Sequence, residues 1–186
     1  MGGHRRLVAT TLAVVLAVAA AGCVRGAPAG TAAPASVAPR QPTSAATVVR
    51  TVDGDTVVVR PDGQGAEATV RLIGIDTPET KKPNTPVECF GTQASARLAD
   101  LLPPGAAVLL EPDVEARDRY GRQLAYVHRS DGLFVNLAMV ADGYADGLTI
   151  APNVAHEPEL RAAVRAARDT RAGLWGTCPG PHSPQA

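Results

Sequence analysis

The sequence predicts an α+β protein, a five-stranded β-barrel with about three α-helices. Short valine-rich runs between Val48 and Ile75 are separated by Asp-Gly and Pro-Asp-Gly turn signals. Later segments place apolar residues at helical spacing. The chain has 186 residues, of which 45% are hydrophobic, so it is not disordered as a whole and suits one domain with tails.

The charges are balanced, with eighteen Lys and Arg residues against eighteen Asp and Glu residues. This balance argues against a generally basic protein that coats nucleic acid. Any phosphate-binding surface must therefore be local.

The N-terminus has the pattern of a signal peptide, predicted over residues 1–22. A short basic segment ends at Arg6, and the apolar stretch Leu7–Ala21 is shorter than the roughly 20 residues that span a bilayer. The small residues before Cys23 resemble a bacterial lipobox, although Ala20 stands where a large aliphatic residue is usual. We expect an exported lipoprotein anchored to the membrane through lipidated Cys23. A cleaved, secreted form is the alternative.

Composition divides the rest of the chain into three parts. Residues 23–46 are rich in Ala, Pro, Ser and Thr without an apolar period, which predicts a disordered tether. Residues 47–178 form the predicted folded domain, and residues 179–186 form a tail. Two cysteines remain after Cys23 is assigned to the anchor, and an oxidising compartment favours a disulfide between Cys89 and Cys178. Two free buried thiols are the alternative.

Strands dominate the first half of the domain. Residues 48–52 and 55–60 flank Asp53-Gly54, which predicts a hairpin with a type I′ turn. Residues 67–75 alternate and then become continuously apolar, which predicts a third strand and hence a meander.

The second half alternates helices and strands. Helices are predicted over 91–102, 136–142 and 157–172, and strands over 107–111 and 123–129. Glycines at 143 and 173 follow the last two helices, as C-caps do. This order is compatible with a Greek-key barrel of the OB type.

Three polar clusters carry possible chemistry, and each also has an ordinary structural explanation. The turn explains Asp53 and Gly54, but Asp55 begins a valine-rich strand, where a carboxylate must face solvent or a cation. Residues 118–122 are by themselves a polar turn.

The cluster from Arg71 to Glu79 can be explained as a helix start, with Thr77 as its N-cap. That explanation leaves Arg71 and Asp76 unaccounted for. Strand alternation places Arg71 on the face of Ile73 and Ile75, within reach of Asp76 at the strand end.

Together these clusters resemble the thermonuclease (staphylococcal nuclease) family in order and spacing. The matching runs are Val52–Thr56, Val70–Glu79 and Asp118–Tyr126, and the resemblance covers about residues 47–176. It implies an OB-fold, Ca²⁺-dependent endonuclease that hydrolyses phosphodiester bonds of DNA and RNA and leaves 3′-phosphate ends.

The resemblance also implies roles for individual residues. Asp55, Asp76 and the carbonyl of Thr77 would bind Ca²⁺, and Asp53 would lie in the outer coordination sphere. The catalytic residues would be Glu79 as general base and Arg71 and Arg122 as phosphate clamps. Substrate would also contact Tyr120, with Lys81 and Lys82 adding local positive charge.

Elementary chemistry agrees with these roles. A phosphodiester repels nucleophiles, so its hydrolysis needs a cation on a non-bridging oxygen, an oriented water and donors for the developing charge. Carboxylate and carbonyl oxygens suit a hard ion such as Ca²⁺. The planar fork of Arg meets phosphate bidentately.

Two departures from the family concern substrate binding. Residues 47–178 hold twelve Arg and two Lys against eighteen acids, a net charge of −4, which predicts weak binding to long polyanions. Leu148 and Ile150 stand near the places where the family has tyrosines, so base stacking is reduced. A non-catalytic OB-fold module that binds nucleic acid is the alternative function.

The remaining polar residues indicate no further site from sequence alone. His128 and His156 lack metal-ligand spacing with other His or Cys residues, so they are interpreted as structural or surface residues. No obligate protein partner is implied.

Overall fold

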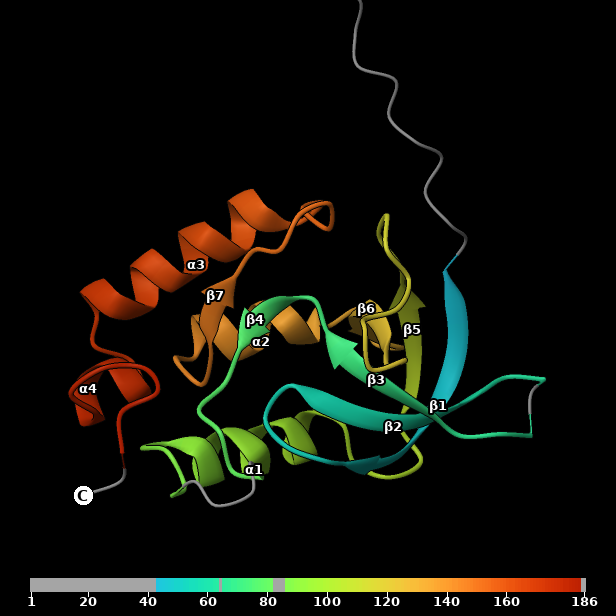
Figure 1. The fold of residues 1–186 in the computed structure, drawn as a ribbon, viewed down its shortest axis with the longest axis horizontal. Coiled ribbons are helices and arrows are strands. Elements are labelled where there is room, and N and C mark those ends of the chain that lie inside the picture. The colour runs from blue at the N-terminus through green and yellow to red at the C-terminus, as the bar shows by residue number, and fades with distance from the viewer. Residues whose placement is uncertain (1–42, 64, 82–85, 185–186) are drawn as a thin grey trace, which may run out of the picture. The chain divides into compact units, whose positions relative to one another are not determined.

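The computed structural model describes residues 43–63, 65–81 and 86–184. Five strands close into a barrel in the order β1-β2-β3-β6-β5, with β5 pairing back to β1 (Figure 1). These strands are β1 (Ser44–Thr51), β2 (Thr56–Pro61), β3 (Ala68–Leu72), β5 (Ala107–Glu111) and β6 (Gln123–Arg129). The predicted α+β barrel of the OB type is confirmed.

The barrel interior is filled by the apolar residues that predicted its strands. Val57, Val59 and Val70 are 0% exposed, as are Leu110 and Val127. The pairs are antiparallel except for β3 and β6, which run parallel and allow the meander to close on a strand from the second half of the chain. Burial of these side chains provides the main driving force for the fold.

The predicted third strand, residues 67–75, is wrong as a single element. It consists of β3 and a separate strand, β4 (Gly74–Asp76), which leaves the barrel and pairs with β7 (Asp146–Leu148). Gly74 adopts a φ of +81°, a conformation that favours glycine. The buried amide of Asn136 holds the bend, since it donates to Ile73 O at 2.8 Å and accepts from Val127 N at 2.9 Å.

The predicted type I′ turn at Asp53-Gly54 is also wrong. A type I′ turn needs positive φ at both central residues, and the described residues with positive φ include neither Asp53 nor Gly54. The backbone amides of Val52 and Asp53 both face Thr56 O instead. Gly54 is required for space, because a Cβ there would lie 2.6 Å from Thr77 Oγ1.

In the described part of the chain, four helices complete the domain: α1 (Gly91–Leu101), α2 (Val135–Ala141), α3 (Glu157–Asp169) and α4 (Leu174–Thr177). Helix α2 contacts β6 and lies between α3 and α1, both of which it also contacts (Figure 1). Helix α3 ends three residues before the predicted boundary at 172, and α4 and β7 were not predicted. No helix starts at Thr77 within the described residues, so the helix-start explanation of that segment is wrong.

Both predicted flanks of the domain contain ordered residues. Strand β1 begins at Ser44, inside the predicted tether, because Ala46 is buried between β2 and β5. In the predicted tail, Ser183 O accepts from Cys89 N at 2.8 Å. The predicted signal peptide and Cys23 lie outside the described residues. Among the described helices, none has the length and apolar character needed to cross a membrane.

Candidate active site

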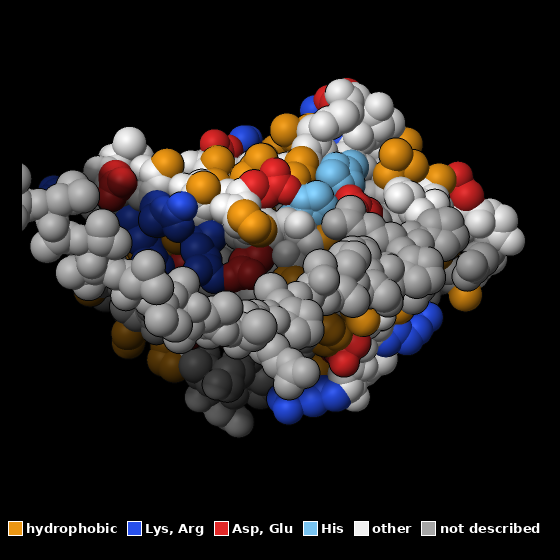
Figure 2. Space-filling model, turned by 90° about the horizontal axis from the view of Figure 1, so that it is seen from above, with side chains coloured by type: hydrophobic (Ala, Val, Ile, Leu, Met, Phe, Trp, Pro, Cys, Tyr) orange, Lys and Arg blue, Asp and Glu red, His pale blue; other side chains and the backbone are white. Residues whose placement is uncertain are grey.

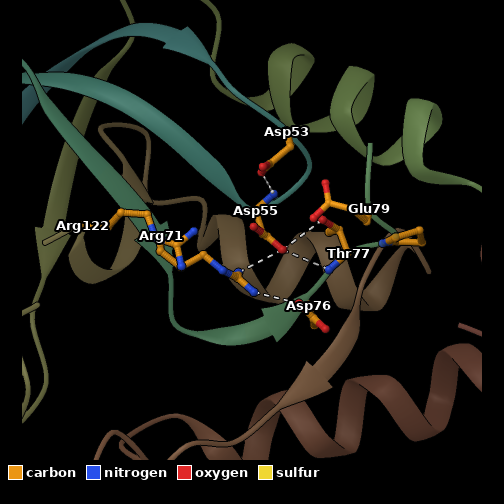
Figure 3. A pocket seen from close by; sticks show the side chains of 8 residues that line it. Asp53, Asp55, Arg71, Asp76, Thr77, Glu79 and Arg122 are labelled. Carbon is orange, nitrogen blue, oxygen red and sulfur yellow. Dashed lines mark hydrogen bonds and ion pairs between the residues drawn. The ribbon is translucent and has the colours of Figure 1, made fainter. Parts of the chain in front are cut away.

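A polar cavity of about 220 Å³ lies where the barrel meets the segment that follows β4. Its walls come from the β1–β2 loop, β3, the end of β4, the residues after it and the loop before β6 (Figure 3). The lining residues are Asp53, Asp55, Arg71, Asp76, Thr77, Pro78, Glu79 and Arg122. All predicted catalytic and metal-binding residues are therefore brought together in one pocket.

Asp55 forms the fixed floor of this pocket. Its side chain is 9% exposed, and Oδ2 accepts from the amide of Thr77 at 3.1 Å and from its hydroxyl at 3.0 Å. Oδ1 accepts from the hydroxyl of Thr56 at 3.0 Å. These donors compensate the burial of a carboxylate and hold it in a single orientation.

Arg71 joins the two predicted calcium ligands. Nη1 lies 3.0 Å from Asp55 Oδ2, and Nη2 lies 2.8 Å from Asp76 Oδ1. Nη1 also donates to the carbonyls of Leu72 at 3.2 Å and Ile75 at 3.0 Å. The guanidinium fork thus ties the bend between β3 and β4 to the floor of the pocket.

Two carboxyl groups of the pocket have raised pKa values, and burial is the main cause. Burial, reinforced by the charge of Asp55, raises the pKa of Asp53 to about 6. Burial also raises the pKa of Asp76, with Arg71 opposing that shift and Asp55 adding to it. Both shifts mark a pocket that favours an additional positive charge.

Glu79 is positioned by the backbone around it. Its Oε1 accepts from the amides of Thr80 at 2.8 Å and Lys81 at 2.6 Å. The amide of Glu79 donates to Glu88 Oε2 at 2.8 Å, and Glu88 N donates back to Glu79 O at 2.9 Å. A Cβ at Gly91 would lie 2.9 Å from Pro78 O, so the start of α1 packs closely against this segment.

Arg122 is held by Asp118 across a tight turn. Its Nε lies 2.6 Å from Asp118 Oδ2, and its amide donates to Asp118 Oδ1 at 2.9 Å. Burial opposes ionisation of Asp118, but the hydrogen bonds from Arg122 and from the amide of Tyr120 lower its pKa below the usual range. Gly121, with a φ of +80°, permits the turn.

A second cavity of about 510 Å³ adjoins the first and shares Arg71 and Arg122 with it. Its other lining residues include Tyr120, Leu148 and Ile150. The Tyr120 side chain is exposed, and its ring lies 5.6 Å from the Arg122 guanidinium. Lys81 is exposed at the end of its segment, whereas Lys82 lies outside the described residues.

The composition of the first pocket fits a divalent cation. Four carboxylates face two guanidiniums there, an excess of two negative charges. Asp55, Asp76 and the carbonyl of Thr77 offer the hard oxygen donors that Ca²⁺ prefers. Asp53 Oδ1 accepts a hydrogen bond from the backbone amide of Asp55 at 3.2 Å and so helps to hold Asp55 in place.

His182 and Glu88 are neighbours of the site that sequence analysis missed. His182 Nε2 lies 3.2 Å from Asp76 Oδ2, and its Nδ1 lies 2.8 Å from Glu88 Oε2. A disulfide joins Cys89 to Cys178 and holds the two segments together. The even cysteine count was the only sequence signal that linked these distant parts of the chain.

The closed five-stranded barrel and a pocket that gathers four carboxylates and two arginines define the class of protein, an OB-fold nuclease. The chain belongs to the staphylococcal nuclease family: residues 69–177 match the family model described as "Staphylococcal nuclease homologue".

Individual relatives agree with this assignment. The chain is 41% identical over 128 residues to the thermonuclease of Staphylococcus intermedius, a match that covers 69% of this chain and 74% of that protein. It is 38% identical over 128 residues to the thermonuclease of Staphylococcus hyicus, with 69% and 73% covered. Endonuclease YncB of Bacillus subtilis is 36% identical over 130 residues, with 69% of this chain and 60% of that protein covered.

Proposed function

We propose that the protein is a Ca²⁺-dependent endonuclease that hydrolyses DNA and RNA and leaves 3′-phosphate ends. The observation that carries the proposal is the pair of carboxylates, Asp55 and Asp76, bridged by Arg71 at 3.0 and 2.8 Å. Relatives named thermonuclease and endonuclease support it.

The metal would be held by Asp55, Asp76 and the carbonyl of Thr77. Bound Ca²⁺ supplies positive charge for a non-bridging phosphate oxygen and helps to orient a water molecule. Asp53 Oδ1 accepts from the backbone amide of Asp55 and so keeps Asp55 in place.

The protein's own groups would carry the proton and the phosphate charge. Glu79 takes a proton from the attacking water, whose oxygen forms a bond to phosphorus while the bond from phosphorus to the 5′-oxygen breaks. The 5′-oxygen takes a proton from solvent as it leaves, so the phosphate remains on the 3′ side. Arg71 and Arg122 neutralise the charge that builds on the phosphate oxygens.

The adjoining cavity would hold a nucleoside of the substrate. Tyr120, Leu148 and Ile150 offer apolar surface there, and Lys81 and Lys82 add positive charge in the segment after Glu79. An exported protein anchored through Cys23, or a secreted one, would meet extracellular nucleic acid.

A plasmid and RNA digestion tests this function. Cleavage should require Ca²⁺ and stop in EDTA, and Asp55→Asn should lose the response to the metal. The 3′ ends should block polymerase extension until a phosphatase removes the phosphate.

Glu79→Gln separates catalysis from binding. Without the base, turnover should fall by roughly 10² to 10⁴ while nucleotide affinity stays nearly unchanged. Arg165→Ala, on the exposed side of α3, is the matched control and should cleave as the wild type does. If Glu79→Gln cleaves at the wild-type rate, the non-catalytic binding module becomes the better account.

A further inference from the structure

A second cluster of possible metal ligands lies outside the proposed active site. Glu111 at the end of β5, His128 on β6 and His156 immediately before α3 place three side chains together. Figure 2 shows histidine side chains gathered beside carboxylates on the face seen from above. None of the three residues lines the active-site pocket.

The distances suit a shared cation. Glu111 Oε2 lies 3.0 Å from His128 Nε2 and 3.2 Å from His156 Nε2, and one ligand atom from each residue lies within 4.8 Å of the others. Tetrahedral zinc with bonds of about 2.0 to 2.1 Å keeps its ligand atoms about 3.3 to 3.4 Å apart. The two distances from Glu111 are thus already close to those of a tetrahedral site.

The hydrogen-bond pattern of His156 supports a cation at this point. Its Nδ1 contacts Glu159 Oε1, while its Nε2 faces both oxygens of Glu111 at 3.3 and 3.2 Å. A neutral imidazole carries only one N–H and so can donate to only one of these carboxylates. When Nδ1–H donates to Glu159, the Nε2 lone pair is directed at Glu111, and a metal ion between them can accept an electron pair from each group.

Neighbouring rings orient both histidines. The His128 ring stacks on Phe134 with a centroid distance of 4.6 Å, and the His156 ring meets Tyr126 edge-on at 4.4 Å. The side chains of His128, Glu111 and His156 are 26%, 19% and 19% exposed, so solvent and ions can reach them. The ligand directions are therefore set before a metal arrives, in a partly open site.

We propose that Glu111, His128 and His156 bind one zinc-class transition-metal ion, with solvent completing the coordination. Two imidazole nitrogens select such an ion over Ca²⁺, which prefers oxygen ligands. The ion joins β5, β6 and the start of α3, and so clamps that helix to the barrel. This site is independent of the proposed nuclease chemistry.

Calorimetric titration of the chelator-treated, full folded protein with Zn²⁺ tests the proposal directly. We expect one ion per chain, no competition from millimolar Ca²⁺, and the visible spectrum of tetrahedral Co²⁺ when cobalt replaces zinc. Zinc should also raise Tm by several degrees, because it binds only the folded form. Asp55→Asn should leave zinc binding unchanged.

Two histidine variants identify the ligands. His128→Gln keeps a donor for Glu111 but should weaken zinc binding by about 100-fold or more and abolish the shift in Tm. His182→Gln, which removes a histidine that contacts Asp76 and Glu88 and is not part of the cluster, should bind zinc as the wild type does. The proposal is overturned if the folded protein takes up no stoichiometric zinc, if His128→Gln binds as tightly as the wild type, or if His182→Gln removes the binding.

Discussion

Replacing Arg71 should separate calcium binding from cleavage, because its guanidinium contacts both proposed calcium ligands. It lies 3.0 Å from Asp55 Oδ2 and 2.8 Å from Asp76 Oδ1, and its side chain is 13% exposed. A cation bound by the same carboxylates therefore meets a like charge at short range. Two unit charges 4 Å apart interact by about 4 kcal/mol at an effective dielectric constant of about 20, and a third of that changes Kd about tenfold.

Two substitutions distinguish the charge of Arg71 from its shape. Arg71→Met removes the charge, so we expect it to bind Ca²⁺ about tenfold more tightly yet cleave at least about 10²-fold more slowly. Arg71→Lys keeps the charge, so its calcium affinity should stay within about threefold of the wild type. Its turnover should still fall at least about tenfold, because an ammonium cannot reproduce the bidentate fork.

Calorimetry gives the calcium Kd, and the initial rate on a defined oligonucleotide at saturating Ca²⁺ gives turnover. Arg60→Met is the matched control, because Arg60 forms an exposed ion pair with Glu67 at 3.1 Å and lines neither cavity. Weaker calcium binding by Arg71→Met, or cleavage by it at the wild-type rate, would refute the reasoning.

Three further predictions concern stability and the shape of the site. Gly54→Ala places a Cβ 2.6 Å from Thr77 Oγ1, so denaturant titration should show that the free energy of unfolding falls by about 1 to 3 kcal/mol. Calcium affinity should fall as well, and a variant as stable as the wild type would contradict this close packing. The Cys89–Cys178 disulfide closes a loop with a sequence separation of 89, so its reduction should lower the free energy of unfolding by up to about 4 to 5 kcal/mol. Peptide mapping without reductant should recover the two cysteines linked. Burial and the charge of Asp55 raise the pKa of Asp53 to about 6 in the folded protein, above its value in the unfolded chain. The folded state therefore loses stability as Asp53 ionises. In EDTA, the free energy of unfolding should fall by about 1 to 2 kcal/mol between about pH 4 and pH 7. Asp53→Asn should flatten that pH profile, and an unchanged profile would show that Asp53 is not the group responsible.

Apolar periodicity in the sequence was sufficient to predict strands and helices whose bounds depend on neighbouring residues. The strands 107–111 and 123–129 have the bounds expected from their apolar runs, and the helix starting at Gly91 ends within one residue of its expected boundary. The pocket residues could also be predicted, because Asp55 and Arg71 are out of place in apolar strands unless they meet a partner.

Long-range contacts account for what the sequence did not reveal. The run from Val70 to Ile75 has no turn signal stronger than Gly74, and the bend there depends on an amide from Asn136, over sixty positions away. Glu111 and His156 are 45 positions apart and show no ligand spacing, so only the closed barrel brings them together.

The contacts that position Glu79 form late, because they depend on residues near the C-terminal end of the domain. Glu88 holds the amide of Glu79, while His182 and the disulfide at Cys89 tie Glu88 to residues about ninety positions downstream. During synthesis the barrel strands emerge well before those fastening residues, and the thiols must still be oxidised. A nascent or reduced chain can thus have its proposed calcium ligands in place while Glu79, the proposed general base, is not yet held in position. If the proposed mechanism holds, cleavage then begins only after the disulfide has formed.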